Sequence, residues 1–146
     1  ARYLAGAARV VIVDLHTGLG PYGEAEIILN DPQHGPAYQR AVACWGEARV
    51  KSTVSGESVS SQLSGTVKLA FDRMLAGVEV TAVGLEFGTS PPMQVFKALR
   101  EENWLHQQAG DNHPQAARIK QQFLKMFYPD DDLWKQNIIT KGQPNF

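Results

Sequence analysis

The strongest hydrophobic pattern in the chain is a continuous β-branched run that stops at polar and glycine residues. Val10–Val13 are followed by Asp14 and His16, and glycines then interrupt residues 18–23. Such a run predicts a buried strand at about residues 9–15 that ends in a loop. Open α/β sheets bind their ligands at the carboxyl ends of strands of this kind. The pattern therefore makes Asp14 and His16 candidates for a functional site, with the histidine as a metal ligand.

Short apolar runs bounded by turn residues predict the other strands, and apolar residues at helical spacing predict the helices. Residues 78–87 form the second strong strand, with apolar residues on both faces, as in a sheet that is covered on both sides. Glu86 stands near the carboxyl end of this strand. The other predicted elements are strands at 25–29 and 50–54, helices at 37–45, 66–75 and 91–108, a helix capped by Asn112 or His113 that continues to Phe127, and a short helix at 130–134.

The composition limits the class of protein. The chain has 146 residues, which fits a single domain over 1–146, and the Ser/Gly-rich residues 55–65 predict a mobile surface loop. The formal net charge is −1 without a basic stripe, so nucleic acid is not an expected partner. No apolar run could span a membrane and no signal peptide is seen, which favours a cytoplasmic protein.

His16 and Glu86 are expected to meet in space, because parallel strands bring their carboxyl ends to one edge of a sheet. A neutral imidazole can bind Zn²⁺, and a carboxylate that is not a ligand could take a proton from the metal-bound water. Asp14 could accept a proton from the second ring nitrogen and fix the tautomer. A structural interpretation also stays open for each residue, as a hydrogen-bonded loop residue or a loop anchor. Tyr22, in the glycine loop, could likewise be an anchor or a substrate contact.

Three segments carry a resemblance to a known superfamily. They are Val-Asp-Leu-His-Thr-Gly-Leu-Gly-Pro-Tyr-Gly at 13–23, Leu-Glu-Phe-Gly-Thr at 85–89 and Leu-Arg-Glu-Glu-Asn-Trp-Leu-His at 99–106. The chain resembles an uncharacterised branch of the zinc carboxypeptidase-like metallopeptidases, relatives of the carboxypeptidases A and of the aspartoacylase and succinylglutamate desuccinylase group. The resemblance extends from about residue 9 to about residue 135.

The resemblance implies a three-layer α/β/α sandwich around a mixed, largely parallel, twisted sheet. It also implies a zinc cofactor and hydrolysis of an amide bond in a peptide or an N-acyl amino acid. His16 matches a zinc ligand of the superfamily, and Glu86 matches its general acid/base. Asp14 and Thr17 would support the metal ligand, and Tyr22 would contact the substrate.

One departure from the superfamily pattern changes what is expected of this chain. Two further zinc ligands lie in a His-x-x-Glu motif of the N-terminal half, and no histidine of this chain has a glutamate three residues later. The chain therefore resembles a C-terminal half that is inactive alone, and its expected partner is the missing half or a companion chain. A half-sheet exposes strand edges and apolar faces, so oligomers are also expected. The alternatives are a non-catalytic binding or structural module and, third, a metal-free hydrolase, although the chain has no Gly-x-Ser-x-Gly sequence.

Overall fold

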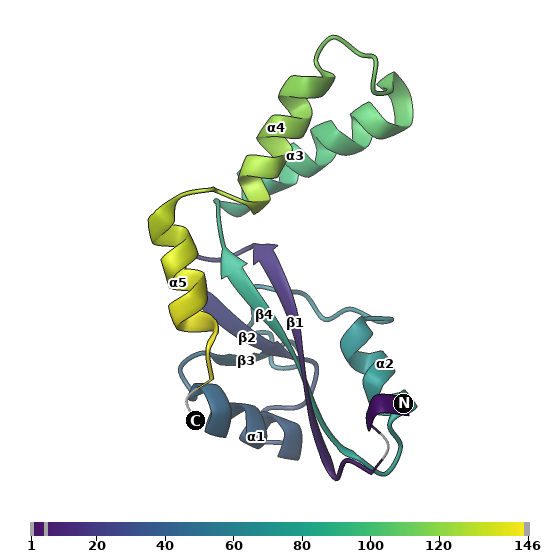
Figure 1. Ribbon diagram of the computed structural model, residues 1–146, viewed down its shortest axis with the longest axis vertical. Coiled ribbons are helices and arrows are strands. Elements are labelled where there is room, and N and C mark those ends of the chain that lie inside the picture. Colours follow the sequence, from purple (N-terminus) through teal and green to yellow (C-terminus); the bar gives the residue numbers. More distant parts are fainter. Residues whose placement is uncertain (1, 5, 145–146) are drawn as a thin grey trace. The chain divides into compact units, whose positions relative to one another are not determined.

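The computed structural model describes residues 2–4 and 6–144 and divides into two compact units (Figure 1). Residues 1, 5, 145 and 146 of the expected domain lie outside the described residues. The sheet unit comprises residues 1–16, 25–86 and 142–146, and the helical unit comprises residues 17–24 and 87–141. A 3-10 turn at Arg2–Leu4 precedes the first strand.

A four-stranded mixed sheet forms the centre of the sheet unit. The strands β1 (Arg9–Gly18), β2 (Ala25–Leu29), β3 (Val50–Ser52) and β4 (Glu79–Gly88) lie in the order β1-β4-β2-β3. β2 and β3 are parallel, with Ile27 beside Val50. β1 and β4 are also parallel, because the Glu79 amide donates to the Ala8 carbonyl at 3.0 Å, and Thr89 bonds Gly18 at the same offset. The predicted α/β class with a mixed sheet is confirmed.

The neighbouring strands β4 and β2 run in opposite directions. Along β4, the neighbouring residue changes from Ile28 of β2 beside Gly84 to Glu24, which directly precedes β2, beside Gly88, so the partner number falls as the β4 number rises. This is the pattern of an antiparallel pair. The sheet therefore combines two parallel pairs with one antiparallel contact.

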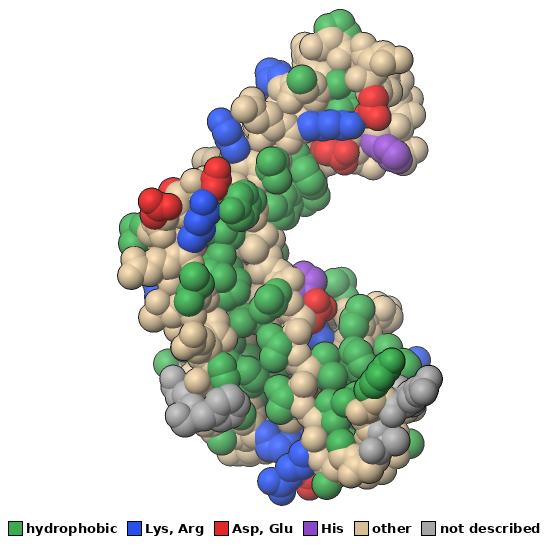
Figure 2. Space-filling model, viewed as in Figure 1, with side chains coloured by type: hydrophobic (Ala, Val, Ile, Leu, Met, Phe, Trp, Pro, Cys, Tyr) green, Lys and Arg blue, Asp and Glu red, His purple; other side chains and the backbone are tan. Residues whose placement is uncertain are grey.

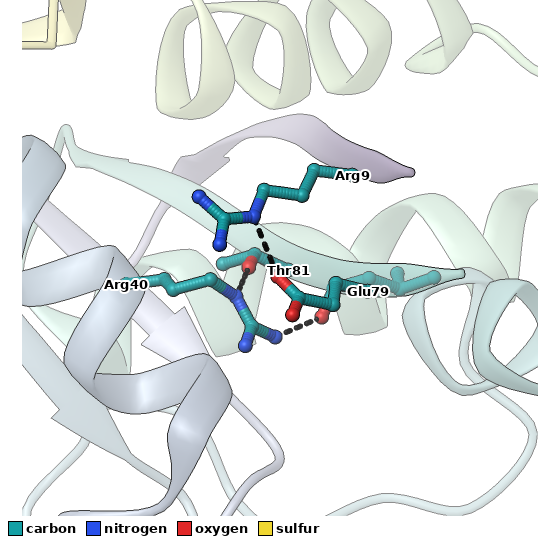
Figure 3. A network of polar contacts seen from close by, with 5 residues as sticks. Arg9, Arg40, Glu79 and Thr81 are labelled. Atoms are coloured by element: carbon teal, nitrogen blue, oxygen red, sulfur yellow. Dashed lines mark hydrogen bonds and ion pairs between the residues drawn. The ribbon is translucent and has the colours of Figure 1, made fainter. Parts of the chain in front are cut away.

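Helix α1 (Pro36–Trp45) covers one face of the sheet, and Pro36 occupies its first turn, where no amide donor is needed. Arg40 fixes this helix to β4, since its Nε donates to the Thr81 hydroxyl and its Nη2 to the Val80 carbonyl, both at 2.7 Å (Figure 3). The nearly inaccessible core residues between α1 and the strands are Ile27, Leu29, Tyr38, Ala41, Trp45, Val50, Val83 and Leu85.

Helix α2 (Val67–Met74) packs on the opposite face. The Thr66 hydroxyl caps this helix by accepting a hydrogen bond from the Leu69 amide. The cluster beneath α2 consists of Val10, Leu75, Val80 and Ala82, with Ile12 and Phe71 packed against it. The even-numbered residues of β1 and β4 therefore face α2, and the sheet lies between two helical layers (Figure 1).

The prediction that the first strand is buried is wrong for one of its faces. β1 is an edge strand of the sheet, and its odd-numbered residues Val11, Val13 and Leu15 are 50%, 44% and 68% exposed. Helix α1 packs against β2 and β3, so it does not cover this face of β1. A continuous β-branched run predicts a strand but cannot show which of its faces will be covered.

The helical unit is built around an antiparallel pair of helices, α3 (Pro92–Trp104) and α4 (Ala116–Phe127). A π-helical turn at Leu105–Ala109 extends α3, which agrees with the helix predicted at 91–108. The prediction that Asn112 or His113 caps the next helix is wrong, because its N-cap residue is Gln115, whose side chain makes no capping hydrogen bond. His113 lies in the turn before the helix, where its Nδ1 atom accepts a hydrogen bond from the Gln115 amide at 3.2 Å. Leu105, Ala116 and Ile119 form the buried cluster of this pair.

The last helix, α5 (Asp132–Gly142), is longer than the predicted segment 130–134. Asp131 begins it by accepting a hydrogen bond from the Trp134 amide at 2.8 Å. Near its other end, Lys141 lies 2.5 Å from the Glu24 carboxylate, which stabilises the extra turns. No helix in the described part of the chain is long and apolar enough to cross a membrane.

Candidate functional site

His16 and Glu86 occupy neighbouring positions on adjacent parallel strands of the sheet unit. The hydrogen bond from the Glu79 amide to the Ala8 carbonyl sets a register in which residue 86 lies beside residue 16. Neighbouring strands are about 4.8 Å apart, so two side chains at such positions on one face can approach each other. Both residues have even numbers and continue the face that α2 covers. The structure therefore brings together the two residues that the sequence predicted would meet.

Asp14 orients the His16 ring. Its Oδ2 lies 2.9 Å from His16 Nε2; the His16 side chain is 52% exposed and the Asp14 side chain is 33% exposed. If the Nε2 atom carries the proton in this contact, the lone pair of Nδ1 is available to a ligand. An imidazole that a carboxylate holds in this way is the usual arrangement of a histidine that binds a metal.

Lys68 also lies near these residues, although no sequence pattern predicted it. It lies in the first turn of α2, and its ammonium is 3.4 Å from the Ile28 carbonyl. Partial burial lowers the pKa of Lys68 below its ordinary value, while the negative charges of Asp14 and Glu86 act in the opposite direction. No spacing in the sequence marks this lysine, because it comes from a helix and reaches over strands distant in sequence.

The glycines after His16 have a structural task in the helical unit. A Cβ atom on Gly88 would lie 2.0 Å from the Pro21 carbonyl oxygen and 2.5 Å from the Gly20 carbonyl carbon, so no side chain fits there. The Gly23 amide donates to the Gly88 carbonyl at 2.9 Å, and Trp134 Nε1 donates to the same oxygen at 3.0 Å. Gly88 thus permits the close approach of two backbones that shapes the loop.

Thr17 and Tyr22 belong to the helical unit. The Thr17 hydroxyl donates to the Phe127 carbonyl at 2.7 Å, which gives this side chain a structural partner at the end of α4. Thr17 also has the opposite parity to Asp14 and His16, so it points to the other face of β1. Tyr22 is 47% exposed in the turn before Gly23. The roles predicted for these two residues in binding stay predictions.

The donor atoms fit one ligand of a zinc site rather than a whole site. His16 and its carboxylate partner Asp14 form the environment that such a ligand needs. Within residues 2–4 and 6–144, no group of three or more His, Cys, Asp and Glu side chains is placed to hold a metal ion. A closed zinc site therefore needs further donors besides those described here.

A concave region lies on α3 in the helical unit. Its volume is about 660 Å³, and it is lined by Met93, Gln94, Phe96, Lys97, Arg100, Glu101 and Trp104. Figure 2 shows hydrophobic side chains at the surface of this unit, and three of these lining residues, Met93, Phe96 and Trp104, are exposed. The signal in the sequence is their helical spacing, which does not distinguish a buried stripe from an exposed one.

Residues 1–141 match the family described as "Protein of unknown function (DUF2817)". Since this match spans nearly the whole chain, the chain belongs to that family. The family is uncharacterised, as expected, whereas the zinc carboxypeptidase-like superfamily stays a prediction. Neither a curated protein nor a solved structure matches the chain significantly.

Proposed function

We propose that this DUF2817 family member contributes one wall of a zinc-dependent amide hydrolase, with His16 as a metal ligand and Glu86 as the general base. The observation that carries the proposal is the register of β1 and β4, which places these two residues side by side at the carboxyl ends of parallel strands. Asp14 supports it, since a proton on His16 Nε2 in this contact would leave the Nδ1 lone pair available to a ligand.

The chemistry follows from what each group can do. Zinc, when bound, supplies a Lewis acid that makes water nucleophilic at neutral pH. Glu86 would take a proton from the attacking water and later deliver it to the leaving amine. Asp14 would hold the His16 ring in one orientation and one tautomer. Tyr22 would contact the substrate, which we propose is a peptide C-terminus or an N-acyl amino acid.

The remaining zinc ligands would come from a complementing segment or companion chain that carries a His-x-x-Glu motif. The exposed row on β1 supports such a partner, because Val11, Val13 and Leu15 are apolar side chains on an edge strand. A second copy of the chain is the alternative occupant of this edge. We place the complete enzyme in the cytoplasm.

The test is made on the longest natural polypeptide that contains these residues. Zinc content is measured by mass spectrometry, and hydrolysis is assayed on panels of C-terminal dipeptides and N-acyl amino acids. We expect Glu86→Gln to retain zinc and to lower kcat about 10²- to 10⁴-fold, the usual range for loss of a general base. His16→Ala should lose both zinc and hydrolysis.

Two matched variants serve as controls. Glu79→Gln removes an exposed carboxylate from the same strand, where it pairs with Arg9 at 2.7 Å, and should change neither zinc content nor hydrolysis (Figure 3). His106→Ala removes a histidine of the π-helical turn and should be equally neutral. Full turnover in Glu86→Gln would refute the assignment of the base. A wild-type protein without stoichiometric metal would favour a non-catalytic binding module, which the lack of a complete ligand cluster in the described residues also permits.

A further inference from the structure

The Lys68 ammonium lies against the sheet at the place where residue 84 has no side chain. A Cβ atom built on Gly84 would be 2.9 Å from Lys68 Nζ, closer than carbon and nitrogen atoms approach without a bond. The ammonium is also 3.4 Å from the carbonyl of Ile28, on the adjacent strand β2. The helix α2 therefore sends this lysine onto the α2-facing side of the sheet.

Residue 84 is a glycine because Lys68 occupies the space of a side chain, and not because the backbone conformation requires a glycine. The φ angle of Gly84 lies outside the left-handed region, so an alanine could adopt the same backbone. The other nearby atom, Ile28 Cβ, is 3.9 Å from the hypothetical Cβ, which is an ordinary contact. The one close neighbour is the end of a flexible side chain. A glycine in the interior of a strand often marks such a close approach.

The strand register places two carboxylates around the position of the Lys68 ammonium. Asp14 lies beside Gly84 on the adjacent strand, and Glu86 is two residues further along β4. Asp14 and Glu86 are the two carboxylates that favour its charged form, and both lie on the face of the sheet that Gly84 shares. An ammonium has three donors, of which the Ile28 carbonyl can accept only one. A partly buried ammonium is stable only with partners of opposite charge or with acceptors.

We propose that Lys68 is a positioning residue of the candidate site, admitted by Gly84, whose ammonium holds the carboxylates of Asp14 and Glu86 in their working orientations. Without this ammonium, two negative groups would share one face of the sheet and repel each other. Asp14 would then orient His16 less well, and Glu86 would be less well placed for proton transfer. The catalytic part of this inference rests on the proposed function, but the charge coupling does not.

The first experiment measures the coupling without any assay of activity. The side-chain signal of Lys68 is followed by NMR during a pH titration of protein labelled with ¹³C-lysine, and it is assigned by its loss in Lys68→Arg. We expect Glu86→Gln and Asp14→Asn each to lower the pKa of Lys68, because each removes a negative charge. Glu79→Gln is the matched control and should leave this pKa unchanged, since Glu79 pairs with Arg9.

Gly84→Ala tests the space itself. The added methyl group should displace the ammonium, return the pKa of Lys68 toward its ordinary value and weaken its response to Glu86→Gln. Folding is checked by circular dichroism, and Gly84→Ala is expected to fold because only a flexible side chain must move. If Glu86→Gln and Asp14→Asn leave the titration of Lys68 unchanged in folded protein, the proposal is overturned.

The second experiment concerns catalysis in the longest natural polypeptide that contains these residues. We expect Lys68→Met to lower kcat about 10- to 100-fold with little change in KM, as for a misplaced catalytic group, and Lys68→Arg to restore part of the loss. An unchanged kcat in Lys68→Met would overturn the positioning role. Coupling in the titration together with a wild-type protein that hydrolyses nothing would overturn the proposed function and leave the Lys68–carboxylate cluster in place.

Discussion

The sheet unit and the helical unit differ in how completely they cover their hydrophobic residues. In the sheet unit, Ile27, Leu29 and Val83 are inaccessible to solvent, because helices lie on both faces of the central strands. In the helical unit, α3 leaves Met93 74% exposed and Phe96 52% exposed. A central strand is enclosed from two sides, whereas each helix of a two-helix pair can bury only one stripe.

The better-covered sheet unit is also the unit that contains the candidate site. Asp14, His16, Lys68 and Glu86 all belong to the sheet unit, on strands or on a helix that packs against them. Side chains on well-packed elements hold their relative positions better than side chains on loops. The helical unit instead presents an open apolar surface on α3, which is typical of a surface that another molecule covers.

The largest effect on the free energy of unfolding is expected when one leucine in each unit is replaced by alanine. Leu85→Ala, in the core of the sheet unit, should lower the free energy of unfolding by about 2–5 kcal/mol, because it leaves a cavity. Leu99→Ala on α3 should lower it by about 1 kcal/mol or less, since Leu99 is 44% exposed. Urea denaturation followed by circular dichroism measures both. Equal losses would show that the two units are packed alike.

A smaller effect is expected from tryptophans within the helical unit. Trp134→Phe removes the buried hydrogen bond from Nε1 to the Gly88 carbonyl and should lower the free energy of unfolding by about 1–2 kcal/mol. Trp104→Phe is the control, because Trp104 is partly exposed on α3, and a change of about 0.5 kcal/mol or less is expected. Thermal unfolding distinguishes them. If both variants lose the same small amount, the loop around Gly88 is no better packed than α3.

The smallest expected effects come from two carboxylates, Asp31 and Asp111, whose pKa values are shifted in opposite directions. In the sheet unit, burial raises the pKa of Asp31 above its ordinary 3.8, and Asp72 raises it further, against a smaller opposing effect of Arg40. In the helical unit, the hydrogen bond from Lys120 lowers the pKa of the exposed Asp111. At neutral pH, Asp31→Asn should therefore raise the melting temperature slightly, and Asp111→Asn should lower it slightly.

The pH dependence follows from these directions. The gain from Asp31→Asn should shrink as the pH falls through the raised pKa of the folded protein, and it should vanish below 3.8, where the carboxyl is protonated in both states. The loss from Asp111→Asn should be complete above 3.8, shrink as the pH falls below 3.8 and vanish below the lowered pKa of the folded protein. Calorimetric scans at several pH values measure both, and shifts of the same sign would contradict the comparison.

Much of the fold was predictable from local patterns. The strand at 25–29 has the bounds that its apolar run predicted, and the helices predicted at 37–45 and 66–75 each begin within one residue of the predicted start. The differences lie at the ends of elements. The hydrogen bond from Thr89 extends β1 to Gly18, and α5 continues to Gly142, where Lys141 meets Glu24. Such contacts between distant residues leave no signal in a local window.

The candidate site was predictable in part for the same reason. His16 and Glu86 each follow a β-rich run, so the sequence alone predicted that they end neighbouring strands. Lys68 was not predictable, because its ammonium reaches Gly84 from a different element. The supporting role that the resemblance implies for Thr17 stays a prediction, and its hydroxyl donates to the Phe127 carbonyl. Successive residues of a strand point to opposite faces, which separates Thr17 from His16.

Local patterns were enough to predict most of the elements, the α/β class and the positions of His16 and Glu86 near the ends of strands, because alternation and helical spacing are local properties. Only the tertiary structure decided that β1 is an edge strand with Val11, Val13 and Leu15 exposed. It also decided that Lys68 lies over Gly84. The physical reason is that strand order and helix placement depend on which surfaces bury each other, and that is a property of the whole packed chain.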